Sequence, residues 1–283
     1  MTKRRDIEEH VRVLDEIRGI MGAMKNLALM ESHKLSRALA TQHQVVVDIE
    51  AAGQDFLTFH PTLAPDVSGK ELYLVIGAER GFCGDFNDRL LDGLERHLRA
   101  TEDQDPTLIV VGRKLVDRVQ QTHRVMNSVE GPTVMEEVQA VLIRVIDHLR
   151  DAAVRRSREG RAPVTAIYHD AVTDSVIIRP LHTLHPSRRQ VSERSYPPLL
   201  TLPPAMFFSE LLDLYLFSLL HAIFYSALMA ESRARLEHLE SALQRLERDQ
   251  ADLLRRRNRL RQDEITEEIE VLMLSTLVER PHR

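Results

Sequence analysis

One glycine-bearing segment has the residue types that could bind an anion. Residues 80–87 read RGFCGDFN and directly follow a short apolar run. A glycine-bearing loop between a strand and a helix can bind phosphate, because helix N-termini attract anions. The spacing matches no phosphate fingerprint, since there is no G-x-G-x-x-G and no Lys-Ser or Lys-Thr follows Gly84. The pattern favours a structural tight turn, with nucleotide binding as the alternative.

The other residue types that carry chemistry give weaker signals. Cys83 has no histidine close in sequence to lower the pKa of a thiol nucleophile. His182 and His185 are three apart, but they lie between two prolines and are typical of a loop surface rather than of a metal site. The sequence therefore indicates no catalytic or metal-binding constellation.

An arginine-rich run near residue 260 is the strongest local charge feature. Five arginines in seven positions are soon followed by acidic residues: Arg255, Arg256, Arg257, Arg259 and Arg261, then Asp263, Glu264, Glu267, Glu268 and Glu270. Arginines on a helix can bind a phosphate backbone. The two signs together suit charged loops of a protein partner better than nucleic acid.

Composition favours long helices over a compact β-rich enzyme. The 283 residues include 29% charged and 5% aromatic residues and no tryptophan. A net charge of −5 gives no general attraction to nucleic acid or anionic lipid. A single cysteine cannot form an internal disulfide, which indicates a reducing compartment and excludes a cysteine-built zinc site. Acidic residues near the start and no apolar run there predict a cytoplasmic chain.

A long amphipathic helix is predicted at each end of the chain. Residues 6–59 contain no proline, and we expect this helix to end near His60-Pro61, with Gly53 as an alternative earlier break. Its apolar residues recur at steps of three and four: Ile7, Val11, Leu14, Ile17, Met21, Met24 and Ala28. The last helix is predicted over 204–278, about 110 Å at 1.5 Å per residue.

The last helix carries two further patterns. The uncharged window 214–230 is shorter than the roughly 20 residues of a membrane span and predicts a buried helix segment instead. Beyond it, leucines follow the seven-residue repeat of a left-handed coiled coil: Leu236, Leu239, Leu243, Leu246, Leu253 and Leu260. Because so long a helix needs a partner, we expect it to pair with the first helix.

Short apolar runs alternate with helical stretches between the two long helices. Strands are predicted at 72–77, 108–112, 164–168 and 176–178, and helices at 86–98, 114–121 and 134–157. The last two strands are close enough for a hairpin across Asp174-Ser175. The predicted fold is α/β: a long antiparallel coiled coil of the terminal helices, 1–60 and 203–283, with a Rossmann-like α/β domain inserted at 68–196.

Three segments resemble the gamma subunit of F-type ATP synthases. Its pattern N-x-x-R-Q-x-x-I-T-x-E is matched near the end of the chain, R-G-L-C-G-x-x-N after the first strand, and S-E-x-x-A-R in the last helix. The matching residues are Asn258, Arg261, Gln262, Ile265, Thr266 and Glu268; Arg80, Gly81, Cys83, Gly84 and Asn87; and Glu231 and Arg235. Met24 matches the methionine of the family's K-I-T-x-A-M in the first helix.

The resemblance implies a non-catalytic rotor shaft that needs no cofactor. In this family the coiled coil enters a ring of alpha and beta subunits, and the α/β body contacts the epsilon subunit and the membrane rotor ring of c subunits. It implies no nucleic-acid partner, membrane association only through partners, and a location on the cytoplasmic face of a bacterial membrane. Arg261, Gln262 and Thr266 match positions that contact a catch loop of the beta subunit.

The first helix departs from the family pattern. Gly19, Met21 and Gly22 replace a lysine, a threonine and a polar or basic residue. Each glycine costs a helix about 1 kcal/mol relative to alanine, for which a closer approach of the helices would compensate. The departures indicate a divergent bacterial form and leave open whether the coupled ion is a proton or sodium, as in an ATP-driven sodium pump. A nucleotide-binding α/β enzyme stays the alternative class.

Overall fold

The computed structural model describes residues 2–64, 69–123, 125–156, 163–181, 184 and 197–278. The chain forms two compact units, Met1–Leu27 with Glu237–Arg283, and Ala28–Leu236. The long helices α1 (Thr2–Phe59) and α5 (Pro204–Val278) each contribute residues to both units. The division of the sequence into 1–60, 68–196 and 203–283 stays a prediction, because packing groups the residues across those segments.

The larger unit contains a five-stranded sheet in the order β3-β2-β1-β4-β5. Its strands are β1 (Leu72–Ile76), β2 (Thr107–Val111), β3 (Val125–Val129), β4 (Val164–Asp170) and β5 (Ser175–Pro180). Neighbouring strands from β3 to β4 are parallel, and β5 is antiparallel to β4. The central strand β1 is buried along its whole length, as its continuous apolar run predicts.

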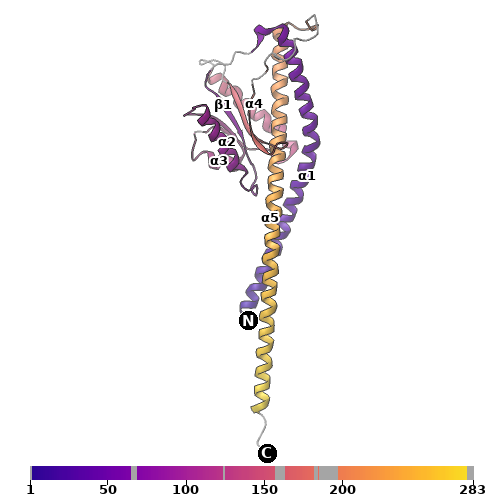
Figure 1. Ribbon diagram of the computed structural model, residues 1–283, viewed down its shortest axis with the longest axis vertical. Helices are drawn as coiled ribbons and strands as arrows, with labels where there is room; N and C mark the ends of the chain where they lie inside the picture. Colours follow the sequence, from indigo (N-terminus) through magenta and orange to yellow (C-terminus); the bar gives the residue numbers. More distant parts are fainter. Residues whose placement is uncertain are drawn as a thin grey trace, which may run out of the picture. The chain divides into compact units, whose positions relative to one another are not determined.

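Helices cover both faces of this sheet (Figure 1). Alternate residues of β1 divide between two apolar clusters, because successive side chains of a strand point to opposite faces. Tyr73 and Val75 pack with α2 (Phe86–Ala100) and α3 (Arg113–Val119). On the other face, Leu72, Leu74 and Ile76 pack with α4 (Val138–Arg156) and with the parts of α1 and α5 that belong to this unit.

The structure confirms the strands predicted from apolar runs and adds one. β3 reads VMNSV, and three of its five residues are half-buried, so its sequence lacks the apolar character of the other parallel strands. The helix predicted over 134–157 begins later, at Val138, after a 3-10 turn over Met135–Glu137. The predicted hairpin is present, with Asp174 at φ 49° in the turn between β4 and β5.

Within the larger unit α1 and α5 pack antiparallel. Gln42 Nε2 donates a 3.0 Å hydrogen bond to the Ser218 carbonyl, and the Tyr215 hydroxyl donates one of 3.0 Å to Glu50 Oε1. The Phe56 ring lies 5.7 Å from that of Phe208. As numbers rise along α1, the partners' numbers fall along α5.

The structure supports the prediction that the apolar window 214–230 of α5 is a buried helix segment. By length and composition α5 is a candidate membrane span, but 67% of its most apolar window is buried inside the protein. Tyr215, Leu219 and Phe224 are fully covered within the core of the larger unit. α1 runs through Gly53 without a break and ends at Phe59, directly before His60-Pro61.

In the smaller unit the two helices also run antiparallel. Arg4 Nη1 lies 2.8 Å from Glu264 Oε2, and Lys25 Nζ lies 3.0 Å from Glu240 Oε1. Leu239 and Leu246, one heptad apart, are buried, which confirms the leucine repeat as the contact seam.

One expectation for the first helix is wrong, and one residue of its apolar period lies outside the helix contact. Ile17 is 39% exposed, because a two-helix pair buries only a narrow seam and Ile17 falls beside it. A Cβ atom added at Gly19 or Gly22 would meet nothing within 4 Å, so these glycines do not serve a close approach of the helices.

Candidate functional site

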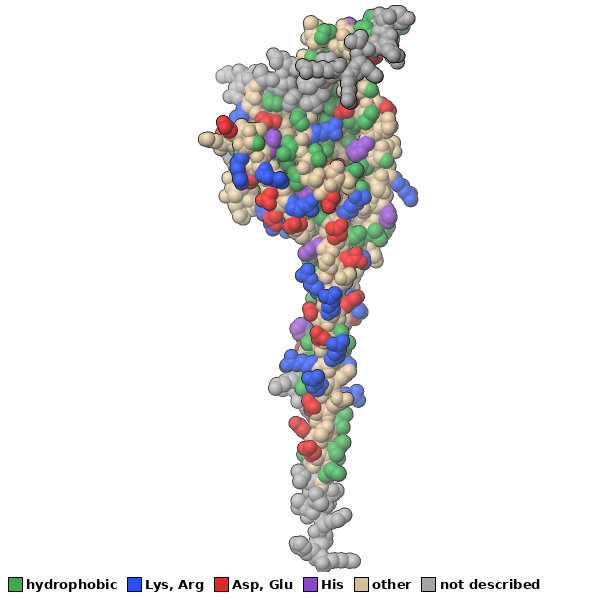
Figure 2. All heavy atoms as spheres, viewed as in Figure 1, with side chains coloured by type: hydrophobic (Ala, Val, Ile, Leu, Met, Phe, Trp, Pro, Cys, Tyr) green, Lys and Arg blue, Asp and Glu red, His purple; other side chains and the backbone are tan. Residues whose placement is uncertain are grey.

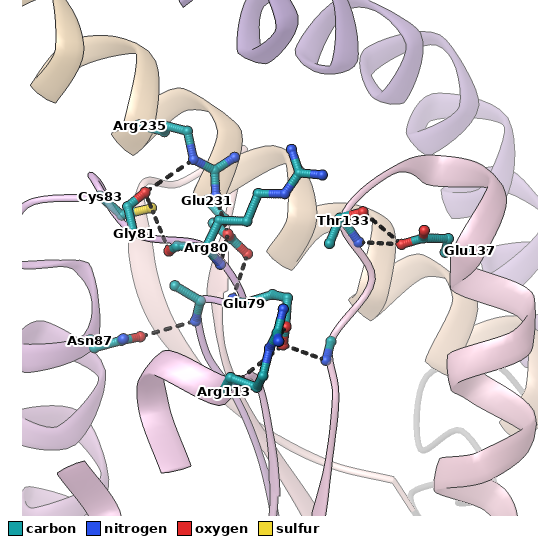
Figure 3. Close-up of polar contacts among 12 residues, drawn as sticks. Glu79, Arg80, Gly81, Cys83, Asn87, Arg113, Thr133, Glu137, Glu231 and Arg235 are labelled. Carbon is teal, nitrogen blue, oxygen red and sulfur yellow. Dashed lines mark hydrogen bonds and ion pairs between the residues drawn. The ribbon is translucent and has the colours of Figure 1, made fainter. Parts of the chain in front are cut away.

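The loop after β1 meets α5 through a buried carboxylate and a buried arginine (Figure 3). The Glu231 carboxylate accepts hydrogen bonds from the backbone N–H groups of Glu79 (3.3 Å) and Arg80 (3.1 Å). One turn further along α5, Arg235 pairs with Glu231, and its Nε donates a 3.2 Å hydrogen bond to the Gly81 carbonyl. Two motifs that are far apart in sequence are therefore one contact, which we call the loop–helix cluster: Glu79, Arg80, Gly81, Glu231 and Arg235.

The loop keeps its shape through its own residues. Asn87, near the start of α2, accepts a 3.0 Å hydrogen bond from the Ala78 N–H at its Oδ1. Gly84 has φ 59°, a left-handed conformation that favours glycine. Phe82 has φ 65° and is 53% exposed, so a bulky side chain occupies a strained position at the loop surface. These features confirm the expected tight turn.

A second buried carboxylate, which the sequence analysis missed, joins three loops. Glu79 Oε2 accepts hydrogen bonds from the N–H groups of Arg113 (3.0 Å) and Gly131 (2.8 Å), and the carboxylate pairs with the Arg113 side chain. These residues follow β2 and β3, whereas Glu79 follows β1. The available signal was an acidic residue three positions after a buried strand, among apolar and glycine residues.

A third carboxylate, also missed, attaches the end of β4 to α5. Asp170 accepts hydrogen bonds from the Ser226 hydroxyl (2.7 Å) and from the Thr173 N–H (2.9 Å). Arg233 Nη1 donates a 2.5 Å hydrogen bond to the Ala171 carbonyl. Burial acts to raise the pKa of Asp170, but the hydrogen bonds from Ser226, Thr173 and Val172 outweigh it and hold the pKa below its ordinary value.

The electrostatics around Cys83 make it a poor nucleophile. Burial raises the pKa of its thiol to about 12, with a further contribution from Glu231 that Arg235 opposes. The sulfur lies 3.5 Å from the carbonyl oxygens of Arg80 and Gly81. Burial also raises the pKa of Glu231, against the effects of Arg235 and the two backbone amides. The arrangement can hold a helix on a loop, and the described residues around it offer no activated nucleophile.

Metal binding finds no support among the described residues. Those residues contain no group of three or more His, Cys, Asp or Glu side chains placed to hold an ion. His182 and His185 lie outside the described residues. The described part of the chain therefore supplies no candidate metal centre.

The predicted partner-contact residues lie on an exposed stretch of α5 in the smaller unit. Arg261, Gln262, Thr266 and Glu268 are exposed. The Thr266 hydroxyl donates a 2.9 Å hydrogen bond to the Gln262 carbonyl. Ile265 is 45% exposed. Four functional groups are thus presented together on one helix.

Of the other motif residues in the smaller unit, Asn258 continues that stretch of α5 and Met24 lies apart from it. Asn258 Oδ1 accepts a 3.2 Å hydrogen bond from Arg257, one turn before Arg261. Met24 is half-buried next to Lys25, which pairs with Glu240. Glu240 precedes Arg261 by about 30 Å of helix at 1.5 Å per residue, so Met24 is far from the exposed stretch.

Fold and site together define a class: an antiparallel pair of long helices with an inserted α/β domain, joined by buried polar side chains. A family model described as "ATP synthase" matches residues 3–273. The chain therefore belongs to the ATP synthase family, in agreement with the gamma-subunit resemblance of its motifs.

Curated relatives support this membership. The ATP synthase gamma chain of Staphylococcus haemolyticus is 23% identical, with 95% of this chain and 96% of the relative covered. That of Desulfitobacterium hafniense is 32% identical over 120 residues, which cover 40% of this chain and 42% of the relative. The second alignment thus spans less than half of its relative, whereas the first spans nearly all of it.

Solved structures share the fold. A chain of the Euglena gracilis mitochondrial ATP synthase, in a structure of OSCP, F1 and c-ring, aligns with a TM-score of 0.63 and 17% identity over 98% of this chain and 94% of that one. A chain from the rotor of the same enzyme aligns with a TM-score of 0.57 and 16% identity, over 93% of this chain and 99% of that one. These two ATP synthase chains and the present chain therefore share one fold.

Proposed function

We propose that this chain is the central rotor shaft of a rotary ATP synthase and carries no catalytic site of its own. The observation that supports this most directly is the end of α5. Beyond Glu264, which pairs with Arg4, α5 continues over residues 265–278, about 20 Å at 1.5 Å per residue. Ile265, Ile269 and Leu272 there are 45%, 51% and 65% exposed. Figure 2 shows hydrophobic and acidic side chains together toward this end of the helix. Exposed apolar side chains on such a helix are suited to a protein partner.

The proposed partners follow from the family and from the titles of the similar structures. The end of α5 would lie inside a ring of alpha and beta subunits, and the α/β domain would contact an epsilon subunit and the c-ring. The chain would then be held at the cytoplasmic face of a bacterial membrane through these partners. The ion coupled to rotation, proton or sodium, would be selected by the membrane ring.

Arg261, Gln262 and Thr266 are the proposed contacts with a catch loop of the beta subunit. All three are exposed. Arg261 has no hydrogen-bonding or ionic partner among the residues that the structure describes, so its five donors are available to a carboxylate. Gln262 retains its side-chain amide for a partner, because only its backbone carbonyl is bound by Thr266.

The test is to co-express the chain with the alpha and beta subunits of its source and to measure the ATPase activity of the purified complex. The variant Arg261→Ala/Gln262→Ala should assemble and lose at least about tenfold in ATPase activity, as expected for removal of charge-assisted hydrogen bonds. The matched control is Glu247→Ala/Arg248→Ala, an exposed pair on the same helix. If the chain assembles and both variants keep full activity, the proposed contacts are wrong; if the wild-type chain never joins the ring, the rotor function is wrong.

A second candidate, a nucleotide-binding enzyme, would use the loop after β1. The two backbone amides at its start are bound to Glu231 within the chain. That candidate requires ATP, ADP or a nicotinamide nucleotide to raise the melting temperature of the isolated chain. No shift at millimolar nucleotide would remove it.

A further inference from the structure

The sheet has a place where related architectures bind ligands. In open α/β sheets ligands bind outside the carboxyl ends of the strands, at the point where the strand order reverses. The order β3-β2-β1-β4-β5 puts that point between β1 and β4, because the chain moves from β1 to β2 on one side and places β4 on the other. The loops that follow β1 and β4 therefore border the crevice.

α5 contacts both of these loops with polar side chains. Glu231 and Arg235 bind the loop after β1, and Ser226 binds Asp170 at the end of β4. Ser226 and Glu231 are 1% and 4% exposed, so the crevice is closed by the chain itself. In Figure 3 the carboxylate of Glu231 points from α5 to the backbone of the loop at Arg80.

The contacts of Glu231 are those that proteins use for a bound anion. Two successive backbone N–H groups, of Glu79 and Arg80, converge on the carboxylate, and the Arg235 guanidinium pairs with it. Backbone amides and an arginine are the donors that bind phosphate or carboxylate ligands at such loops. The Arg235 Nε also donates to the Gly81 carbonyl, which fixes the guanidinium against the same loop.

We propose that Glu231 is a built-in anionic ligand of the loop after β1, and that it latches the α/β domain to α5 by occupying the ligand crevice. The Glu231 side chain of α5 then occupies the place that a free anion, such as the phosphate of a nucleotide, would take. The α/β domain and this segment of α5 therefore move together, and the crevice cannot bind a nucleotide. This goes beyond the rotor function, because it assigns the glycine loop and the Glu231–Arg235 pair to one intramolecular binding event.

If Glu231 acts as a bound anion, a free small carboxylate should be able to take its place after the side chain is removed. Glu231→Ala leaves two backbone amides and Nη2 of Arg235 without their acceptor, in a space that a small carboxylate fits. We expect the melting temperature of the full chain to fall by about 5–15 °C, as for a broken buried pair. Formate or acetate should restore at least half of the loss with a saturable concentration dependence, and chloride at the same ionic strength should not.

Two variants serve as controls. Glu237→Ala removes an exposed carboxylate six residues further along the same helix and should change neither the melting temperature nor its response to formate. Glu231→Ala/Arg235→Ala removes the guanidinium as well and should show no restoration by formate. Restoration of the single variant alone supports the proposal, and equal formate effects on Glu231→Ala and Glu237→Ala overturn it.

If Glu231→Ala does not fold, amide hydrogen exchange of the milder variant Glu231→Gln tests the same proposal. Glu231→Gln keeps the shape of the side chain but loses the negative charge. We expect the amides of Glu79 and Arg80 to exchange at least about tenfold faster in Glu231→Gln than in the wild-type chain, equivalent to a 1.4 kcal/mol loss of protection. Unchanged exchange at both amides, with an unchanged melting temperature, would mean that no anion is needed and would overturn the proposal.

Discussion

Ser226 on α5 donates a 2.7 Å hydrogen bond to Oδ1 of Asp170 at the end of β4. The same hydroxyl oxygen accepts a 2.9 Å hydrogen bond from the Ala171 N–H. Both side chains are buried, so the hydroxyl satisfies a carboxylate and an amide that would otherwise be costly to enclose. The contact between α5 and the end of β4 is therefore polar, and its hydrogen bonds require one orientation of the Ser226 hydroxyl.

Acid should weaken the protein through Asp170. Its pKa lies below the ordinary value of 3.8 in the folded chain, so the folded state binds this proton less readily than the unfolded state. The stabilising contribution is present above the unfolded pKa and is lost as the pH falls through the folded pKa. We expect Asp170→Asn to reduce the fall in the free energy of unfolding by up to about 1 kcal/mol as the pH drops from 5 to 3, because asparagine has no proton to bind. Urea unfolding at a series of pH values measures this, and a wild-type pH dependence in the variant would contradict it.

Alanine at Gly19 or Gly22 should stabilise the smaller unit. Both glycines lie inside α1, and a Cβ at either position would meet open space. Each substitution should add about 1 kcal/mol, because alanine has the higher helix propensity. Thermal melting followed by circular dichroism is the measurement. Gly93→Ala is the contrasting control, since its Cβ would lie 2.7 Å from Val176 Cγ1 and should destabilise.

Gly112 should tolerate no side chain. It has φ 107°, and a Cβ there would lie 2.7 Å from the Gly77 carbonyl oxygen, which belongs to the backbone and cannot move away cheaply. We expect Gly112→Ala to lower the free energy of unfolding by more than about 2 kcal/mol. Gly81→Ala, where the added Cβ meets nothing within 4 Å, should change it by less than about 0.5 kcal/mol. Denaturant unfolding measures the free energy of unfolding of both variants. An equally small loss in the two would contradict the predicted clash at Gly112.

Cys83 should react slowly while the chain is folded. A thiol with a pKa of about 12 is almost entirely protonated at pH 8, and the side chain is buried. Iodoacetamide should label it at least about 100-fold more slowly in the native chain than in the chain unfolded by urea. Mass spectrometry gives both rates, and similar rates would show that the loop after β1 opens readily.

Much of the fold could be predicted from the sequence because its signals are local. The heptad leucines around Leu239 and Leu246 define the contact seam of α5, and Pro61 marks the end of α1. The strand β3 was missed, since Asn127 and Ser128 interrupt its apolar run at the edge of the sheet. Ile17 fits the helical period but not the seam, because the period does not state how wide the buried stripe is.

The motif residues were found from sequence, but their physical role depends on the tertiary structure. Arg80, Gly81, Glu231 and Arg235 could be singled out as residues, and nothing in their spacing showed that they bind one another. Glu79 carried only the weak signal of an acidic residue after a buried strand, and Asp170 and Ser226 carried none, because a buried polar side chain is defined by the groups that it meets.

The two long helices, three of the four parallel strands and the tight turn at Gly84 follow from local sequence, since periodicity, proline and glycine act on neighbouring residues. The occupation of the crevice at the end of β1 by Glu231, 151 residues away from its partner Arg80, is visible only in the folded chain. A hydrogen bond between distant segments forms only when the folded chain brings the two residues together, and local conformational preferences do not determine which distant residues meet.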